Sequence, residues 1–281
     1  MSAPTLPIEQ AAGNSGGNSA FAAVFENVSL AFDEKVVLDG VSFRLAHGET
    51  KALFGVAGSG KSVLLKLGLG LMPPDSGRIW MLGEEVTAMS EQELFALRRR
   101  VGIVFQESAL FDSLKVYENV AFRLMEEHTP QREIEDRVRE VLRFVELERT
   151  YDMFPSELSG GMRRRVAIAR AIITQPEVLL YDSPTGGLDP VTSNTIVELV
   201  MKQRDVYHTS ALLVTHRLQD AFTMATHQFD KNTNQMVALP KGKLADVPMS
   251  FLILRDGKVL FDGDAHELAT SRDEYIREYI S

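Results

Sequence analysis

The chain carries one run of residues whose types and spacing suit a loop that holds phosphate. Residues 55–62 read Gly-Val-Ala-Gly-Ser-Gly-Lys-Ser and fit the pattern G-x-x-x-x-G-K-[ST]. Glycines let backbone N–H groups curl around an anion, and a helix that begins near Lys61 adds the positive end of its dipole. We expect Lys61 to reach the β- and γ-phosphates of a nucleoside triphosphate and Ser62 to bind Mg²⁺. The predicted phosphate-binding residues are Gly55, Gly58, Ser59, Gly60, Lys61 and Ser62.

An acidic residue stands at the end of a separate apolar stretch. Residues 178–181 read Val-Leu-Leu-Tyr and predict a buried strand, which Asp182 closes. An isolated acid at a strand end is usually an ordinary loop residue. Beside the phosphate loop, however, Asp182 is predicted to hold Mg²⁺, usually through water.

Between these two motifs lies the sequence Leu-Ser-Gly-Gly-Met, residues 158–162. Ser159 can cap the helix that follows, because apolar residues recur after it at helical spacing. Gly160 and Gly161 leave room for another group to approach the start of this helix closely. An ordinary capped helix is the alternative.

Along the chain the order is the phosphate loop, the Leu-Ser-Gly-Gly-Met motif and the strand-end aspartate. Three motifs in that order resemble those of the ATP-binding cassette (ABC) ATPases. The resemblance runs from about residue 25 to the end of the chain, apart from a polar stretch near residue 240. It implies an α/β fold of the P-loop NTPase type, with a RecA-like ABC ATPase core, an antiparallel β subdomain and a helical subdomain. It also implies the cofactors ATP and Mg²⁺ and a homodimer. Each ATP would lie between the phosphate loop of one copy and Ser159, Gly160 and Gly161 of a second copy.

The resemblance assigns roles to four further residues. Gln106 matches a glutamine whose amide contacts Mg²⁺ or the attacking water, and His216 matches a histidine that senses the γ-phosphate. Asp189 matches an aspartate that acts across the dimer. Phe32 could stack on adenine, although a Phe near a strand end is a core residue about half the time.

One position departs from the family pattern. The family places a glutamate directly after the strand-end aspartate, where it polarises the attacking water, and this chain has Ser183 there. A hydroxyl is a poor proton acceptor near neutral pH, and a positioned general base contributes roughly 10²–10⁴-fold to a rate. We expect ATP binding to survive and hydrolysis to be slow, with His216, a displaced acid or the phosphate itself in the glutamate's place. Two alternatives stay open: a clamp driven by ATP binding alone, and an engineered serine that traps ATP.

Two stretches, residues 106–122 and 155–166, resemble one branch of the family, the ATP-binding subunits of MCE-linked (Mla-type) lipid transporters. This resemblance implies phospholipid cargo, an integral membrane permease, a STAS-domain subunit and a periplasmic MCE protein. It places the chain at the cytoplasmic face of the bacterial inner membrane as a peripheral subunit. The alternatives are the ATPase of a different ABC importer and, with less support, a soluble ABC protein of translation or repair.

Leu110, Phe111 and Leu114 are candidate permease contacts, since the stretch they occupy borders the groove where a permease docks in this family. Packing inside the helical subdomain is an equal alternative. Two arginine runs, residues 98–100 and 163–165, are interpreted as solvated helix faces with carboxylate partners rather than as a nucleic-acid surface.

Composition limits the other functions. With 30 basic and 39 acidic residues the formal net charge is −9, which argues against a chain built to coat nucleic acid. The sequence contains no cysteine, so it has no disulfide, thiolate metal site or cysteine nucleophile. It contains no run of about 18 apolar residues, so we expect any service to a membrane to require binding to another chain.

The motifs require elements that position them. Residues 25–30 and 41–45 predict antiparallel strands, residues 50–54 a short strand that enters the phosphate loop, and residues 61–71 a helix that leaves it. This context makes a chance glycine turn a poor explanation of the loop. Strand and helix signals then alternate as far as residue 214, which predicts a parallel sheet.

We expect a single folded domain with a tail. Residues 1–22 are small and polar and predict a disordered tail. Residues 23–281 are predicted to form one ABC ATPase domain. Within it, a helical subdomain covers about residues 107–165, and a polar surface insertion covers about residues 230–249.

Overall fold

A computed structural model of the chain describes residues 20–280 except 231, 234, 241–244 and 246. The tail predicted for residues 1–22 lies outside the described residues as far as residue 19. The first strand, β1 (Phe21–Phe32), already contains the last two residues of that predicted tail. Ala22 is fully buried there, within the hydrophobic core on which β1 packs.

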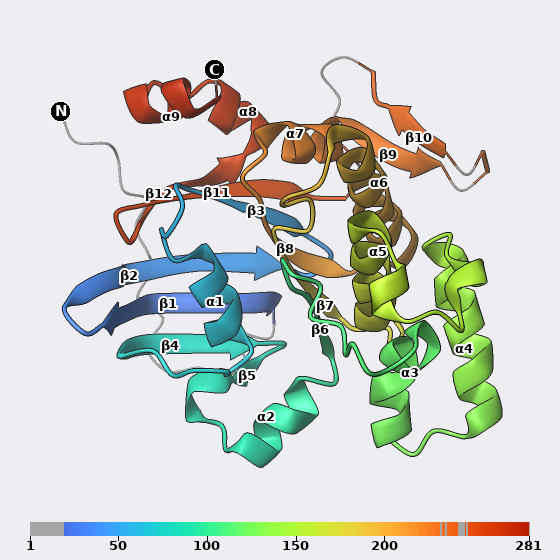
Figure 1. Ribbon diagram of the computed structural model, residues 1–281. Helices are drawn as coiled ribbons and strands as arrows, with labels where there is room; N and C mark the ends of the chain where they lie inside the picture. The colour runs from blue at the N-terminus through green and yellow to red at the C-terminus, as the bar shows by residue number, and fades with distance from the viewer. Residues whose placement is uncertain (1–19, 231, 234, 241–244, 246, 281) are drawn as a thin grey trace.

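The strands that carry the nucleotide motifs lie in one six-stranded sheet (Figure 1). In spatial order they are β12 (Lys258–Asp264), β11 (Met249–Arg255), β3 (Thr50–Phe54), β8 (Ser210–Val214), β7 (Val178–Asp182) and β6 (Val101–Val104). All neighbours pair in parallel except β12, which is antiparallel to β11. Every residue of β3 and β8 is buried, as expected for strands covered on both faces. The predicted parallel sheet is confirmed.

A second sheet of four strands is antiparallel and forms the β subdomain. Its order is β2-β1-β4-β5, where β2 is Lys35–Ala46, β4 is Ser76–Met81 and β5 is Glu84–Glu85. β1 and β2 join through a tight turn between Phe32 and Lys35. The rings of Phe25 and Phe43 stack across this pair with their centroids 4.4 Å apart. Buried side chains of this sheet share one core with helix α1 (Lys61–Gly68) and the parallel sheet.

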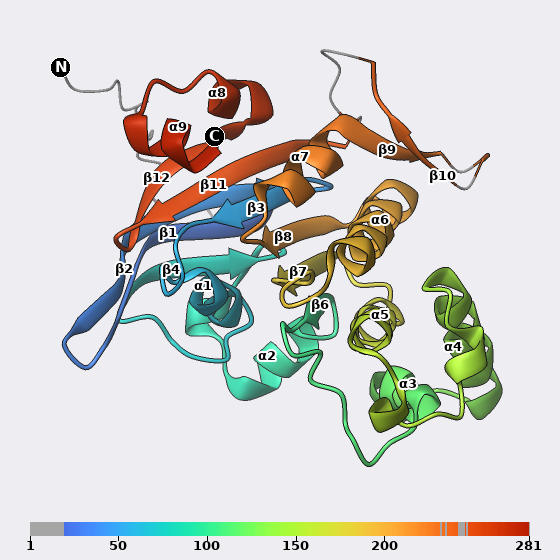
Figure 2. The same ribbon diagram turned by 45° about the horizontal axis from the view of Figure 1, so that its top comes forward.

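Helices α3 (Val116–Glu126) and α4 (Gln131–Phe144) gather with α5 (Gly160–Ile172) at one side of the molecule (Figures 1 and 2). Apolar side chains such as Val120, Val138 and Val166 pack into a common core there. The helical subdomain was expected at about residues 107–165, but α5 continues beyond residue 165 and also packs against β6 of the parallel sheet. α5 therefore joins the helical subdomain to the sheet.

The remaining helices pack against the two sheets. They are α2 (Glu91–Leu97), α6 (Pro190–Tyr207), α7 (Leu218–Thr226), α8 (Ala265–Ala269) and α9 (Glu274–Ile280), with short 3-10 turns at Val86–Ala88, Glu148–Thr150 and Pro155–Glu157. Among the described residues, no helix is both long and apolar enough to cross a membrane.

The polar insertion expected at about 230–249 contains regular structure where the structure describes it. Strands β9 (His227–Asp230) and β10 (Gln235–Ala238) pair as an antiparallel ribbon that projects from the body of the protein (Figures 1 and 2). The closing strand β11 begins at Met249, inside the expected insertion. Pairing in a ribbon satisfies backbone N–H and C=O groups that a loop would leave to water, which the polar composition alone could not reveal.

Candidate nucleotide-binding site

The phosphate loop connects β3 to α1, as the sequence predicted. Lys61 folds back across it, and its ammonium donates to Gly55 O at 2.8 Å, Val56 O at 2.9 Å and Ser59 Oγ at 3.1 Å. The side chain is only 4% exposed. Burial lowers the pKa of Lys61, while the nearby Asp182 carboxylate opposes that shift. Lys61 is therefore positioned to exchange loop oxygens for phosphate oxygens.

Two glycines of the loop are required by its backbone. Gly60 caps α1 with φ 93°, and an added Cβ would lie 2.6 Å from the Leu38 side chain of β2. Gly55 has φ 145°, and an added Cβ would lie 2.4 Å from Leu254 O of β11. Both are left-handed or otherwise strained for an L-residue, so glycine is the residue that allows this path.

Ser62 and Asp182 meet although they lie 120 positions apart in the chain. Ser62 Oγ donates to Asp182 Oδ1 at 2.8 Å. A hydroxyl and a carboxylate oxygen side by side suit Mg²⁺, which binds few protein oxygens and keeps several waters. The donor set on this chain therefore fits the predicted metal, with Ser62 and Asp182 as the residues that would hold it.

Ser183 sits in a turn that leaves its side chain only 3% exposed. Its backbone has φ 48°, its N–H donates to Val214 O at 2.9 Å, and its carbonyl accepts from Gly186 N at 2.9 Å. Gln106 lies beside the same turn, since an added Cβ on Gly186 would be 3.6 Å from Gln106 Cγ and 3.4 Å from Ser183 Cβ. The structure thus brings together Gln106 and Ser183, both predicted from the sequence.

His216 follows β8 and is exposed. Burial of part of the ring lowers the pKa of His216 from 6.5, the Lys61 cation lowers it further, and Asp182 opposes the shift. Neutral imidazole therefore predominates near pH 7. His216 therefore lies near Lys61 and Asp182, at the ends of the parallel strands.

Sequence reasoning missed a second carboxylate near this turn. Asp220 is buried in the first turn of α7 and accepts a hydrogen bond from Thr185 Oγ1 at 2.7 Å. Burial raises the pKa of Asp220, while Thr185 and Arg217, 3.3 Å away, oppose that effect. The only sign of this residue in the sequence was an acid four residues after His216. Its position near the Ser183 turn depends on the hydrogen bond from Thr185, which the sequence does not reveal.

Ser159 caps α5 as predicted, and its Oγ accepts from Met162 N at 3.2 Å. Ser159 and Gly160 are exposed, but Gly161 is buried. An added Cβ on Gly161 would lie 2.3 Å from Thr192 Cγ2 of α6. Within one chain, then, Gly161 is needed for helix packing, whereas Gly160 remains open to an approaching group.

Asp189 caps α6. Its carboxylate accepts from Val191 N at 3.0 Å, Thr192 N at 3.0 Å and Thr192 Oγ1 at 2.5 Å, and these bonds lower the pKa of Asp189.

Phe32 lies at the β1–β2 turn with 46% of its surface exposed. The Val37 carbonyl of the same hairpin lies 3.1 Å from an added Cβ on Gly60, so the hairpin abuts the phosphate loop.

The segment after Gln106 is held rigidly. The buried Asn119 accepts from Phe111 N at 2.8 Å and donates to Leu114 O at 2.9 Å, and Arg170 donates to Ala109 O at 2.7 Å. Phe111 remains 42% exposed and packs its ring against Phe122. Of the three candidate permease contacts, Phe111 is the most open, while Leu110 packs on the core of the helical subdomain.

The arginine run at residues 163–165 was interpreted as a solvated face, and for Arg164 this is wrong. Arg164 is buried and donates to Phe105 O at 2.9 Å and Gly186 O at 3.3 Å. Carbonyl acceptors from distant segments leave no pattern in a sequence. For Arg100 the expected carboxylate partners are confirmed, with Glu84 and Glu177 at 2.7 and 2.6 Å.

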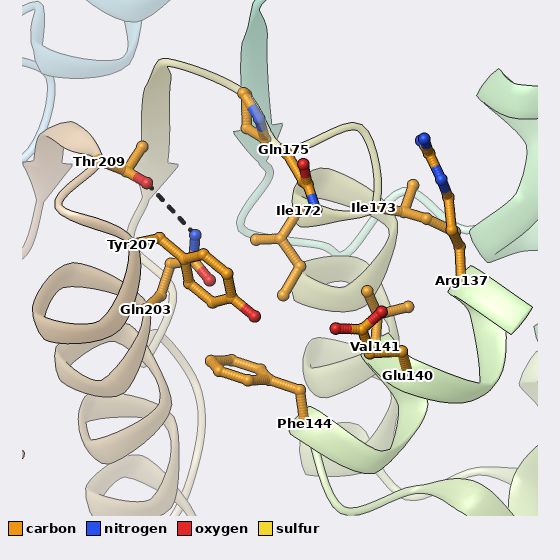
Figure 3. Close-up of a pocket in the computed structure, with 11 residues that line it drawn as sticks. Arg137, Glu140, Val141, Phe144, Ile172, Ile173, Gln175, Gln203, Tyr207 and Thr209 are labelled. Atoms are coloured by element: carbon orange, nitrogen blue, oxygen red, sulfur yellow. Dashed lines mark hydrogen bonds between the residues drawn. The ribbon is translucent and has the colours of Figure 1, made fainter. Parts of the chain in front are cut away.

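A cavity of about 290 Å³ lies elsewhere, between α4 and the C-terminal ends of α5 and α6 (Figure 3). Phe144 and Tyr207 face it, and among its other lining residues Gln203 donates weakly to Thr209 Oγ1 at 3.4 Å. None of the residues predicted to bind nucleotide lines it. The predicted nucleotide-binding residues therefore lie away from this cavity.

Comparison with known proteins agrees with this geometry. The profile of the ABC transporter family matches residues 38–186. The protein TRIGALACTOSYLDIACYLGLYCEROL 3, chloroplastic, of Arabidopsis thaliana is 37% identical over 265 residues, 91% of this chain and 72% of that protein. Methionine import ATP-binding protein MetN 2 of Bacillus anthracis is 34% identical over 261 residues, 92% of this chain and 72% of that protein. A dimeric structure of the ATP-binding cassette MJ0796, in a post-hydrolysis state with ADP and Pi, has a TM-score of 0.71 and 28% identity, covering 86% of this chain and 98% of that one.

Proposed function

Since the chain belongs to the ATP-binding subunits of ABC transporters, we propose that it is the ATPase that energises a membrane transporter of phospholipid, of the Mla type. The cargo is the finer part of the proposal. Support for it comes from the likeness of residues 106–122 and 155–166 to the Mla-type subunits and from the 37% identity to a relative named for a galactolipid.

The observation that carries the ATPase function is the contact between Ser62 and Asp182, together with the Lys61 side chain folded back across the phosphate loop. Phosphate oxygens of ATP would replace the carbonyl acceptors of Lys61, and the backbone N–H groups of the loop would bind the same phosphates. Mg²⁺, when bound at Ser62 and Asp182 with Gln106 nearby, supplies positive charge to the phosphate oxygens. The chain's own part is to bind, orient and neutralise, which is most of what phosphoryl transfer requires.

We propose that two copies of the chain enclose two ATP molecules. Ser159 and Gly160 are exposed at the start of α5, where the helix dipole is positive and a phosphate of the other copy's ATP would be bound. Asp189 begins α6 close to this point, since Gly161 contacts Thr192. ATP would thus join the copies, and its loss would release them.

The closing of the dimer would be passed to a permease through the segment after Gln106. The apolar surface formed by Phe111 and Phe122 is exposed, and Asn119 fixes the backbone beneath it. A STAS-domain subunit, a periplasmic MCE protein and a place at the cytoplasmic face of the bacterial inner membrane complete the proposal. Replacing Phe111 with Ser should abolish copurification with the coexpressed Mla-type permease, whereas replacing the similarly exposed Tyr207, at the end of α6, should not.

Hydrolysis is proposed to be slow, because Ser183 offers no proton acceptor and its side chain is buried in the turn. A second candidate function follows from the same observation: a clamp that binds ATP without hydrolysing it. Phosphate release from the purified complex separates the two, since the clamp releases none above a Lys61→Ala background.

The cargo is tested with the complex of this chain and its permease in vesicles. We expect phospholipid in the membrane to stimulate phosphate release and methionine to have no effect. Stimulation by methionine alone would reject the lipid proposal and favour a function like the one in the name of MetN 2.

A further inference from the structure

Arg164 connects two loops of the nucleotide site to the helix that begins at Ser159. It belongs to the second turn of α5 and is only 5% exposed. Its Nη1 donates to Phe105 O at 2.9 Å, and its Nη2 donates to Gly186 O at 3.3 Å. Phe105 directly precedes Gln106, and Gly186 closes the turn that begins at Ser183.

The surroundings of this guanidinium are costly. A buried Arg is usually paired with a carboxylate, but in the described part of the chain Arg164 has no carboxylate within ion-pair distance, and its Nε–H has no hydrogen-bond partner. Burial lowers the pKa of Arg164, and only the more distant Glu107 and Asp182 oppose that shift. A buried unsatisfied donor on a charged group calls for a specific reason.

The two neighbouring arginines do not share this arrangement. Arg163 is exposed and donates to Leu158 O at the start of its own helix. Arg165 donates to Val145 O inside the helical subdomain. Of the three, only Arg164 reaches out of the helical subdomain to the segments that follow β6 and β7.

The acceptors of Arg164 belong to two segments that meet at the Gln106 side chain. An added Cβ on Gly186 would lie 3.6 Å from Gln106 Cγ, so the two segments that Arg164 holds are in contact at this glutamine. A shift of α5 would therefore move the backbone of Phe105 and Gly186 together and keep Gln106 against the Ser183 turn.

We propose that Arg164 is a positioning residue, which fixes Gln106 beside the Ser183 turn and ties its position to that of α5. The inference rests on the proposed role of Gln106 at the metal or the attacking water. In this arrangement, movement of Ser159 at the start of α5 reaches Gln106 through one side chain.

The test uses Arg164→Lys, which keeps the charge but cannot hold two carbonyls, with Arg163→Met as the control. In the full chain assembled with its permease, Arg164→Lys should lower kcat about tenfold or more, since small misplacements at a reacting centre cost up to about 10²-fold. The KM for ATP should change by less than about twofold, because the phosphate loop is untouched. Equal kcat in Arg164→Lys and the unsubstituted chain would overturn the proposal.

A double-mutant cycle separates positioning from a general structural role. If Arg164 acts through Gln106, Arg164→Lys added to Gln106→Ala should lower kcat no further than Gln106→Ala alone. Fully additive losses would overturn the inference. If Gln106→Ala alone leaves kcat unchanged, the proposed role of Gln106 fails instead.

A readout without turnover covers the case in which hydrolysis is too slow to follow. Amide hydrogen exchange in peptides that span residues 103–110 and 183–189 should quicken in Arg164→Lys, while a peptide from β8 should not change. Arg163→Met should leave all three as they are. Unchanged exchange in both loops of Arg164→Lys would contradict the proposal.

Discussion

Ser62 Oγ lies 2.8 Å from Asp182 Oδ1 and donates a hydrogen bond to it, which joins the first turn of α1 to the end of β7. The two strands that lead to these residues, β3 and β7, are separated in the sheet by β8. Because all three run in parallel, their carboxyl ends meet at one edge, where ligands of open α/β sheets bind. His216 follows β8 at the same edge, which explains why Lys61 and Asp182 both affect its pKa.

Replacing Lys61 with Ala should abolish ATP-dependent dimerisation. The substitution removes three hydrogen bonds across the phosphate loop and the cation that would bind the phosphates. Light scattering of the purified chain with and without ATP measures the association. Lys66→Ala, on the exposed side of the same helix, is the control. Dimerisation that persists in Lys61→Ala would count against the two-copy arrangement.

Replacing Ser183 with Glu should raise phosphate release from the assembled complex by roughly 10²-fold or more, the contribution of a positioned general base. The matched control is Ser183→Gln, because a glutamine side chain has the same length as glutamate but cannot act as a general base. If Glu and Gln behave alike, or if neither exceeds the serine form, the lack of a base is not what slows hydrolysis.

Turnover should depend on pH through His216. Its pKa lies below 6.5, so the ring is neutral at pH 7 and takes up a proton as the pH falls through that lowered value. Since only the neutral ring can accept a proton from water, kcat should fall as the pH drops below His216's ordinary pKa and through its lowered value. In His216→Gln the acid limb should vanish along with most of the activity. An acid limb that survives in that variant would assign the dependence to another group.

Replacing Gly161 with Ala should destabilise the fold more than replacing Gly160 with Ala. The new methyl on residue 161 would meet Thr192 Cγ2 at 2.3 Å, whereas at residue 160 it meets only Leu188 Cδ2 at 3.7 Å. Overpacking of this kind costs typically about 1–3 kcal/mol. Urea unfolding of the two variants compares their stabilities. Equal midpoints would show that α5 and α6 accommodate the added methyl without loss of stability.

Much of the site was readable because its signals are local. Residues 55–62 define their own turn, Asp182 closes an apolar strand, and Ser159 precedes an apolar helical pattern. Each of these depends on neighbours within about one helical turn, so spacing alone reveals it. The alternation of strands and helices likewise predicted the parallel sheet.

Other features depended on segments that meet only in the fold. The expected insertion contains the β9–β10 ribbon, because the pairing of His227–Asp230 with Gln235–Ala238 is a backbone property and polar side chains conceal it. Asp220 is held by a hydrogen bond from Thr185, and Gly161 must lack a side chain because Thr192 packs against it. Neither contact is visible in the sequence.

The sequence by itself determined the family of the protein and predicted the residues that would meet the phosphates, since their pattern is one of short-range geometry. Only the tertiary structure decided that Arg164 is buried and which carbonyls it holds. Its acceptors are backbone oxygens 59 and 22 positions away, and every residue type carries the same backbone oxygen. Such contacts are fixed by how helices and strands pack, and no residue spacing encodes them.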